Sequence, residues 1–189
     1  MSAPATFTIE EYERMIARGV FAGRNEKSIE LIRGELRMMS PQGAANAELL
    51  AQLDDWSHDV TDRRKVRVRV QSSIEIPQLD TQPEPDLVWT EARSFSHRRP
   101  VAHEVLLLAE VADSSLDYDL GEKRQLYAEA GIRDYWVFDI PNRSVHVFRD
   151  PSPADFQMRQ TISAGDRVAP LLVDGVSLAV GNLFACLDR

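Results

Sequence analysis

The sequence is poor in cysteine, lacks a long apolar run and has no excess of basic residues, and each shortage excludes a class of protein. Cys186 is its only cysteine, so the chain forms no internal disulfide and no cysteine-based zinc site. Its four histidines are scattered, without the short spacing of a histidine-rich metal site. The longest apolar run near the middle, Val105 to Ala109, is far too short to cross a bilayer, so we expect no membrane partner.

The charge balance and the first residues indicate how the protein meets nucleic acid and in which compartment it is found. The chain has 22 Lys and Arg against 30 Asp and Glu, a net charge of −8. An acidic total disfavours non-specific coating of nucleic acid but leaves room for a local basic patch. Residues 1–6 lack the basic and apolar segments of a signal peptide. We therefore expect a cytoplasmic protein in a reducing compartment.

Length and composition predict one folded domain over residues 1–189. Hydrophobic residues make up 43% and charged residues 28%, which is ordinary for a globular protein. A chain of this length buries roughly 70% of the surface that its unfolded form exposes, so its core needs no disulfide or metal.

Hydrophobic periodicity and capping signals predict a chain of mixed helices and strands, of the α/β (α+β) class. In the first half of the chain we expect a helix over 8–18 that Thr8 and Glu11 cap, hairpin strands at 29–32 and 36–39, and a helix from Ser40-Pro41 through Trp56. A strand over 66–70, which Ile74 and Ile76 extend, and strands over 86–89 and 104–112 follow. We then expect a helix over 120–130, with Asp119 and Glu122 as its capping box and Gly131 as its stop, and strands over 135–138 and 145–148.

Three residues in the middle of the chain break local rules. Glu110 shares one face of a strongly apolar strand with two leucines, and a buried carboxylate is costly unless it is paired, protonated or bound to a cation. Lys123 lies in the middle of the apolar face of the next helix. Asp86 follows Pro85 at the start of a strand. A structural Glu110–Lys123 ion pair and a turn-forming Asp86 are the alternatives to a functional role.

Acidic and basic residues are also segregated along the chain. Residues 104–122 hold six acids and residues 75–91 hold five, and neither stretch contains Lys or Arg. Residues 61–70 are basic and include Arg67 and Arg69. Carboxylates bind Mg²⁺ or Mn²⁺ and arginines hold phosphates, so this pattern favours a metal-dependent phosphodiesterase. The alternative for Arg67 and Arg69 is a solvated sheet face.

An ordered set of short motifs resembles a known family. Its pieces are Glu30–Glu35, Met38–Pro41, Val68–Gln71, Pro83–Leu87, Glu110–Ser115, Tyr118–Lys123, Tyr127-Ala128, Ala130–Ile132 and Asp134–Val137. Together they resemble the Uma-two family of restriction endonuclease-like proteins, within the PD-(D/E)XK nuclease superfamily. The resemblance implies a restriction-endonuclease-like fold, a mixed central β-sheet flanked by helices, with an N-terminal β-hairpin and the site at one edge of the sheet.

The resemblance also implies roles for individual residues. Asp86 and Glu110 would coordinate one or two Mg²⁺ or Mn²⁺ ions, which activate water and stabilise charge on the scissile phosphate. The superfamily's usual lysine lies two residues after the glutamate, where this chain has Ala112. Lys123 from the following helix is the natural substitute, and it would orient the attacking water or stabilise the phosphate.

Three further positions match the family less directly. Glu30 and Gln71 occupy family positions that either contact the metal or order the site. Asn46 stands where many relatives carry a histidine. We treat Glu30, Asn46 and Gln71 as accessory candidates.

Taken together, the sequence predicts a metal-dependent DNA endonuclease that hydrolyses phosphodiester bonds. The alternative is a catalytically lapsed nuclease-fold binding or scaffold protein, with Glu110–Lys123 as a structural ion pair. An RNA substrate stays open because nothing in the sequence reads or rejects a 2′-hydroxyl. A homodimer is compatible with cutting both strands, which needs two sites.

Overall fold

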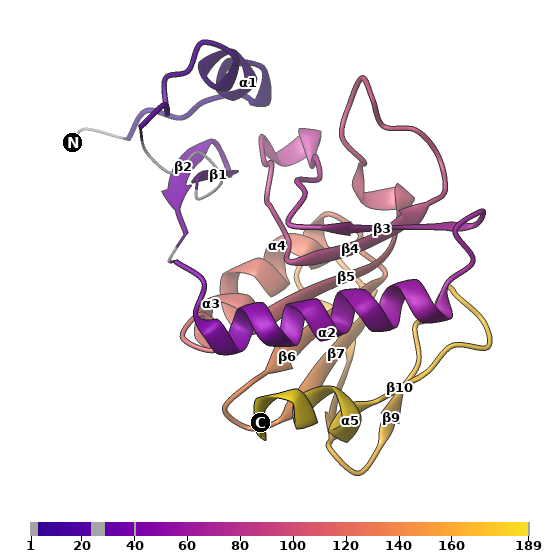
Figure 1. The fold of residues 1–189 in the computed structure, drawn as a ribbon. Helices are drawn as coiled ribbons and strands as arrows, with labels where there is room; N and C mark the ends of the chain where they lie inside the picture. Colours follow the sequence, from indigo (N-terminus) through magenta and orange to yellow (C-terminus); the bar gives the residue numbers. More distant parts are fainter. Residues whose placement is uncertain (1–3, 24–28, 40, 189) are drawn as a thin grey trace.

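The computed structural model describes residues 4–23, 29–39 and 41–188, and a six-stranded mixed sheet forms its centre (Figure 1). The strands are adjacent in the sheet in the order in which they occur in the chain. β5 and β6 pair in parallel, whereas the other four neighbouring pairs are antiparallel. The strands are β3 (Val66–Val70), β4 (Leu87–Glu91), β5 (Val105–Ala112), β6 (Asp134–Asp139), β7 (Ser144–Pro151) and β8 (Phe156–Ser163).

Helices cover both faces of this sheet. On one face α2 (Ala44–Val60) and the short α5 (Val180–Phe184) pack on a core that includes Trp89 and Trp136. On the other face the helical segment between β5 and β6 packs on a core that includes Tyr127 and Tyr135. Side chains alternate along β5, so Leu107, Ala109 and Val111 face α2 while Leu108 and Ala112 face the second core. Glu110 alternates with Leu108 and Ala112 along β5, so its side chain lies on the same face as theirs.

The crossover between the two parallel strands is one continuous helical segment in three parts. It consists of α3 (Leu116–Tyr118), a π-helical turn (Asp119–Lys123) and α4 (Arg124–Glu129). Gly131, with φ of 80°, ends the segment as predicted, because glycine adopts the left-handed conformation without strain. The predicted capping box was wrong. The helix begins before Asp119, whose carboxylate accepts a hydrogen bond from Ser115 Oγ at 2.6 Å instead of capping a helix end.

The start of α2 also differs from the prediction. α2 begins at Ala44, and Gly43 precedes it with an extended backbone (φ −75°, ψ 162°). Ser40, which we expected to cap this helix, lies outside the described residues. Pro41 and Gln42 are not helical, and both line a cavity described below.

β3 stops earlier than its apolar pattern suggested. The amide of Gln71 still donates to the carbonyl oxygen of Asp86 at 2.9 Å, but Gln71 has a positive φ of 44°, which turns the chain out of the sheet. Ile74 and Ile76 therefore do not extend β3, although both are fully buried in the second core. Their burial satisfies the apolar pattern without a strand, and Ile76 forms an isolated bridge with Thr81.

The N-terminal part is a helix followed by a hairpin. α1 (Ile9–Ala17) opens with the predicted capping box of Thr8 and Glu11. β1 (Ile29–Ile32) and β2 (Glu35–Met38) form the predicted hairpin. Its turn residue Gly34 has φ of 76° and bonds through its backbone to Phe7 and Asp80, which ties the hairpin to two other segments.

Shorter elements complete the structure. β9 (Arg167–Val168) and β10 (Leu178–Ala179) form a two-stranded sheet, and 3₁₀ turns span Pro77–Leu79, Ala102–Glu104 and Ala185–Asp188. Over the described ranges, the helices are too short or too polar to cross a membrane.

Candidate functional site

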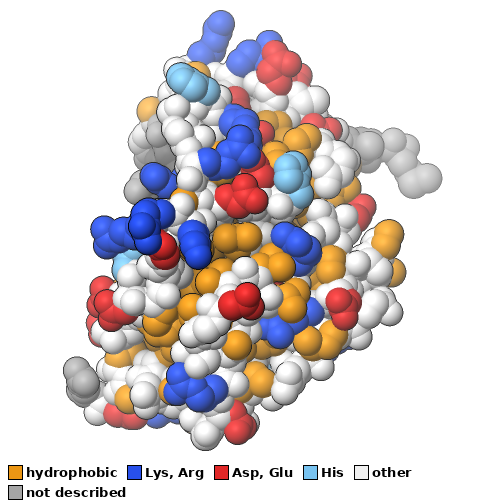
Figure 2. All heavy atoms as spheres, turned by 90° about the vertical axis from the view of Figure 1, so that its right-hand side faces the viewer, with side chains coloured by type: hydrophobic (Ala, Val, Ile, Leu, Met, Phe, Trp, Pro, Cys, Tyr) orange, Lys and Arg blue, Asp and Glu red, His pale blue; other side chains and the backbone are white. Residues whose placement is uncertain are grey.

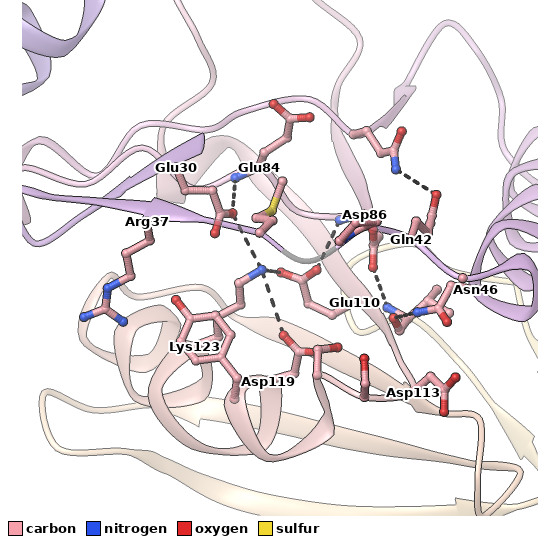
Figure 3. A pocket seen from close by; sticks show the side chains of 18 of the residues that line it. Glu30, Arg37, Gln42, Asn46, Glu84, Asp86, Glu110, Asp113, Asp119 and Lys123 are labelled. Carbon is pink, nitrogen blue, oxygen red and sulfur yellow. Dashed lines mark hydrogen bonds and ion pairs between the residues drawn. The ribbon is translucent and has the colours of Figure 1, made fainter. Parts of the chain in front are cut away.

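A cavity of about 710 Å³ lies where the hairpin, the start of α2, the segment before β4, the strand β5 and the helical crossover meet (Figure 3). Its wall includes residues from each of these elements, far apart in the sequence. The predicted site residues among them are Glu30, Asn46, Gln71, Asp86, Glu110 and Lys123. The fold therefore gathers six of the eight predicted side chains around one space.

Asp86 and Glu110 lie side by side on neighbouring antiparallel strands. Asp86 directly precedes β4, and the register pairs Leu87 with Ala109, so Glu110 is its neighbour across the sheet. Asp86 Oδ2 accepts a hydrogen bond from the amide of Val111 at 2.8 Å. Glu110 Oε2 accepts one from the amide of Asp86 at 3.2 Å. Each carboxylate is thus held by the backbone of the other residue's strand, which fixes the pair.

Lys123 approaches this pair from the helical crossover. Its Nζ lies 3.0 Å from Glu110 Oε1, 3.6 Å from Glu30 Oε1 and 3.9 Å from Asp119 Oδ1. The π-helical turn carries both Asp119 and Lys123, and Figure 3 shows their side chains pointing toward Glu110. Lys123 is only 5% exposed. Its place on an apolar helix face is explained by three carboxylates that reach the same point.

Carboxyl groups outnumber the one ammonium in this buried cluster. Burial raises the pKa of Glu110 well above its usual value, although Lys123 opposes the shift. Burial likewise raises the pKa of Asp86, and that of Asp119 to about 6. For Lys123, burial alone would lower the pKa, but Glu110, Glu30 and Asp119 outweigh it and raise the pKa above the usual range. One ammonium therefore offsets only part of the cost of burying four carboxyl groups.

Neighbouring groups hold the acidic residues in place. Tyr127 Oη donates to Glu110 Oε1 at 2.9 Å, so this oxygen has two donors. Glu30 Oε1 accepts from the amide of Glu84 at 2.7 Å, which joins the hairpin to the segment before Asp86. Asn46 Nδ2 donates to the carbonyl oxygen of Val111 at 2.9 Å. These bonds order the cavity wall around Glu110.

Comparison with known proteins identifies the family. A model of the Uma2 family, described as "Putative restriction endonuclease", matches residues 9–181. The chain belongs to the Uma2 family. The Uma2 match includes every residue that lines the cavity. It bears out the family expected from the sequence motifs.

A solved structure supports the fold expected for a Uma2 protein. The crystal structure of a putative nuclease belonging to DUF820 from Anabaena variabilis has a TM-score of 0.77 to this chain at 15% sequence identity. The similarity covers 97% of this chain and 99% of that one. At this identity it establishes the shared fold. No curated protein matches the chain.

Some predicted residues of this Uma2 chain lie apart from the cluster. Gln71 lines the cavity, where its Nε2 donates to Gln42 Oε1 at 3.2 Å, without contacting a carboxylate of the cluster among the described residues. Arg69 lines a second cavity beside the first. Arg67 is exposed on β3 and lines neither.

Two residues that contact the carboxylate cluster were missed by sequence reasoning. The sequence pattern assigns Asp119 to a helix cap, and Tyr127 to one of the family motifs without a role in the site. Both are four residues from Lys123, and residues at this spacing are neighbours on a helix surface. That spacing was the signal that could have identified them.

The donor set of this Uma2 cavity is compatible with a hard divalent cation. Within the described ranges, no three His, Cys, Asp or Glu side chains are placed to hold a metal ion together. Mg²⁺, however, is usually bound by one or two carboxylates, with water and substrate phosphates completing its coordination. Asp86 and Glu110 supply two carboxylates, and the uncompensated buried charge around them favours a cation. The residues therefore fit Mg²⁺ or Mn²⁺.

Proposed function

We propose that the chain is a metal-dependent endonuclease that hydrolyses phosphodiester bonds of DNA. The observation that carries this proposal is the convergence of Asp86, Glu110 and Lys123 in one cavity, where buried carboxylates outnumber the single ammonium. Membership of a family described as "Putative restriction endonuclease" supports the same reaction class. Perturbed pKa values in a cleft are typical of functional sites.

Asp86 and Glu110 would hold one or two Mg²⁺ or Mn²⁺ ions through their carboxylate oxygens. Bound there, the ion would activate water and neutralise charge on the scissile phosphate. The hydrogen bonds from Val111 and Asp86 amides hold the two carboxylates in a fixed orientation. Such preorganisation favours catalysis because the groups need not rearrange during the reaction.

Lys123 would act on the water or on the phosphate. Its ammonium stays charged, because the pKa is raised above the usual range by the surrounding carboxylates. It can donate to the attacking water or to a phosphate oxygen as negative charge develops. Water would add to phosphorus as the bond to the 3′-oxygen breaks, leaving a 5′-phosphate and a 3′-hydroxyl.

The second candidate is a non-catalytic nuclease-fold scaffold. The 3.0 Å ion pair between Lys123 and Glu110, both buried, favours it, because such a pair stabilises a fold without chemistry. The charge balance argues the other way. A structural pair needs one carboxylate per ammonium, whereas Glu30 and Asp119 also lie within 4 Å of the same nitrogen.

Cleavage of DNA in the presence of Mn²⁺ tests the proposal. Supercoiled plasmid and short single- and double-stranded DNA are incubated with the wild type, Asp86→Ala and Asp117→Ala. Asp117 is an exposed acid of α3 outside the cavity, so its variant makes the same charge change nearby. We expect cleavage by the wild type and Asp117→Ala and none by Asp86→Ala.

Two results would contradict the proposal. Equal cleavage by the wild type and Asp86→Ala would place the activity elsewhere or in a contaminant. A folded wild type that cuts none of these substrates would favour the scaffold function. An RNA strand of the same sequence, included in each series, decides the substrate class.

A further inference from the structure

A second cavity, of about 410 Å³, adjoins the carboxylate cavity, and Gln71 and Glu84 line both. Arg69 from β3 and the loop that follows β4 form much of its wall. This loop stands at the upper right of Figure 1. Seen from that side in Figure 2, the molecule carries Lys and Arg side chains across the upper and left parts of its face. The acidic cavity thus has a neighbour of different charge.

Three guanidinium groups are stacked around one aromatic ring in this region. Arg69, Arg93 and Arg98 lie 5.6, 5.7 and 5.2 Å from the centroid of the Phe95 ring. Glu104, itself only 3% exposed, accepts from Arg93 at 2.7 Å and from Arg98 at 2.6 Å. We call these three arginines with Phe95 and Glu104 the arginine cluster. Its side chains are held in place before any ligand binds, which reduces the entropy lost on binding.

The arginine cluster is not neutral, because Glu104 is one carboxylate for three guanidinium groups. Arg69 forms no ion pair with any described residue, and its buried Nε has no hydrogen-bond acceptor. Burial, with the positive charges of Arg67 and Arg99 nearby, lowers the pKa of Arg69. A buried donor without an acceptor is uncommon in folded proteins and indicates an unmet interaction. The guanidinium of Arg69 is therefore the member best suited to an added anion.

The net charge of the whole protein favours such an anion site for the reaction proposed above. The chain carries a net charge of −8, and its candidate active site is itself rich in carboxylates. A DNA strand is repelled by both, so its approach requires positive charge close to the site. Arg37 and Lys123 of the first cavity are paired with carboxylates, whereas the second cavity presents Arg69, which has no ion pair with a described residue. Guanidinium groups match phosphate oxygens in geometry as well as in charge.

We propose that the arginine cluster, through Arg69 and Arg98, binds a backbone phosphate of the DNA strand adjacent to the linkage that is cut. This inference rests on the proposed function, which places the scissile phosphate beside Asp86 and Glu110. Because Gln71 and Glu84 line both cavities, the phosphate bound by the arginine cluster and the scissile phosphate lie close together along one strand. The site takes a phosphodiester and reads no base.

Binding without cleavage tests the inference. A short fluorescein-labelled DNA duplex is titrated with protein in EDTA at several salt concentrations, and affinity is followed by anisotropy. Arg69→Gln should weaken binding about tenfold at low salt and reduce the slope of log affinity against log salt by about 1. The control is Arg64→Gln, which removes an 89%-exposed arginine before β3. It should bind as the wild type does.

A second variant keeps the test valid if Arg69→Gln unfolds. Ser96→Asp adds a carboxylate to the exposed rim of the same cavity without removing any stacked arginine. It should also weaken binding. Single neutral methylphosphonate linkages, placed along the strand in turn, then locate the contact. One linkage should weaken binding to the wild type and leave binding to Arg69→Gln unchanged.

The outcomes separate this inference from the proposed function. Wild-type affinity and salt slope in both Arg69→Gln and Ser96→Asp would overturn the inference, even if Asp86→Ala abolishes cleavage. Weaker binding of both variants would support the phosphate contact of the arginine cluster even if no DNA is cut, and the proposed function alone would then fail. Inorganic phosphate competing as well as DNA would overturn the assignment to a strand.

Discussion

Replacing Lys123 with Met removes the one ammonium from the carboxylate cluster while keeping a side chain of similar length. Glu110 then loses its partner at 3.0 Å, and Glu30 and Asp119 lose the same cation. Breaking a buried ion pair by removing one partner destabilises a fold by about 3–5 kcal/mol. We expect a loss of unfolding free energy in this range at pH 7 in EDTA.

The loss of unfolding free energy in Lys123→Met should become smaller as the pH falls. Without the lysine, Glu110 must take up a proton to stay buried, and this becomes easier as pH falls. One proton bound by the folded state contributes about 1.4 kcal/mol per pH unit. Lowering the pH from about 7 to about 5 should therefore shrink the deficit over the part of this range in which Glu110 of the wild type, whose pKa is itself raised, is ionised, and by at most about 3 kcal/mol.

Urea unfolding followed by tryptophan fluorescence measures this deficit at both pH values. Lys65→Met is the matched control, because Lys65 is exposed and its variant should change stability by less than about 0.5 kcal/mol. The folded Lys123→Met protein should also lose cleavage, since the proposed function requires its ammonium. A variant as stable as the wild type at pH 7, or a deficit that does not change with pH, would refute the electrostatic reasoning.

Three further substitutions test other parts of the structure. Tyr127→Phe removes the 2.9 Å hydrogen bond to Glu110 and should cost about 1–3 kcal/mol in urea unfolding; an unchanged midpoint would contradict this. Asp119 has a pKa of about 6 in the folded protein against an ordinary value of 3.8, so its contribution is full below about pH 4 and is lost as pH rises past 6. In EDTA, Asp119→Asn should gain up to about 3 kcal/mol relative to the wild type across that window, and parallel pH profiles would count against it. Gly34→Ala places a methyl group 2.9 Å from Thr6 Cβ at a positive φ and should lower the melting temperature, whereas an unaltered melt would show that the hairpin turn adapts.

Local sequence signals predicted the fold where local interactions decide it. Thr8 and Glu11 form the expected capping box, and Gly131 ends the crossover helix in the left-handed conformation. Both depend on residues within one turn of each other. The early end of β3 could not be predicted in this way, because Gln71 adopts a positive φ that its residue type does not favour. Its amide bonds to the distant Asp86, a tertiary contact.

The residues that break local rules were the best guide to the site. Glu110 and Lys123 stood out because a charged side chain occupied an apolar face, and the structure brings them into contact. Asp119 escaped notice because its position also suits a helix cap. The π-helical turn and the Ser115 hydrogen bond that direct its carboxylate inward have no signature in the sequence. The roles of Glu110 and Lys123 in catalysis stay predictions.

The most direct test of the metal centre is the binding of Mn²⁺ itself. Free Mn²⁺ gives a strong electron paramagnetic resonance signal that falls when protein binds the ion. The wild type and Asp117→Asn should reduce this signal equally, and Asp86→Asn should reduce it far less. Equal binding by wild type and Asp86→Asn would contradict the assignment of Asp86 and Glu110 as the metal site.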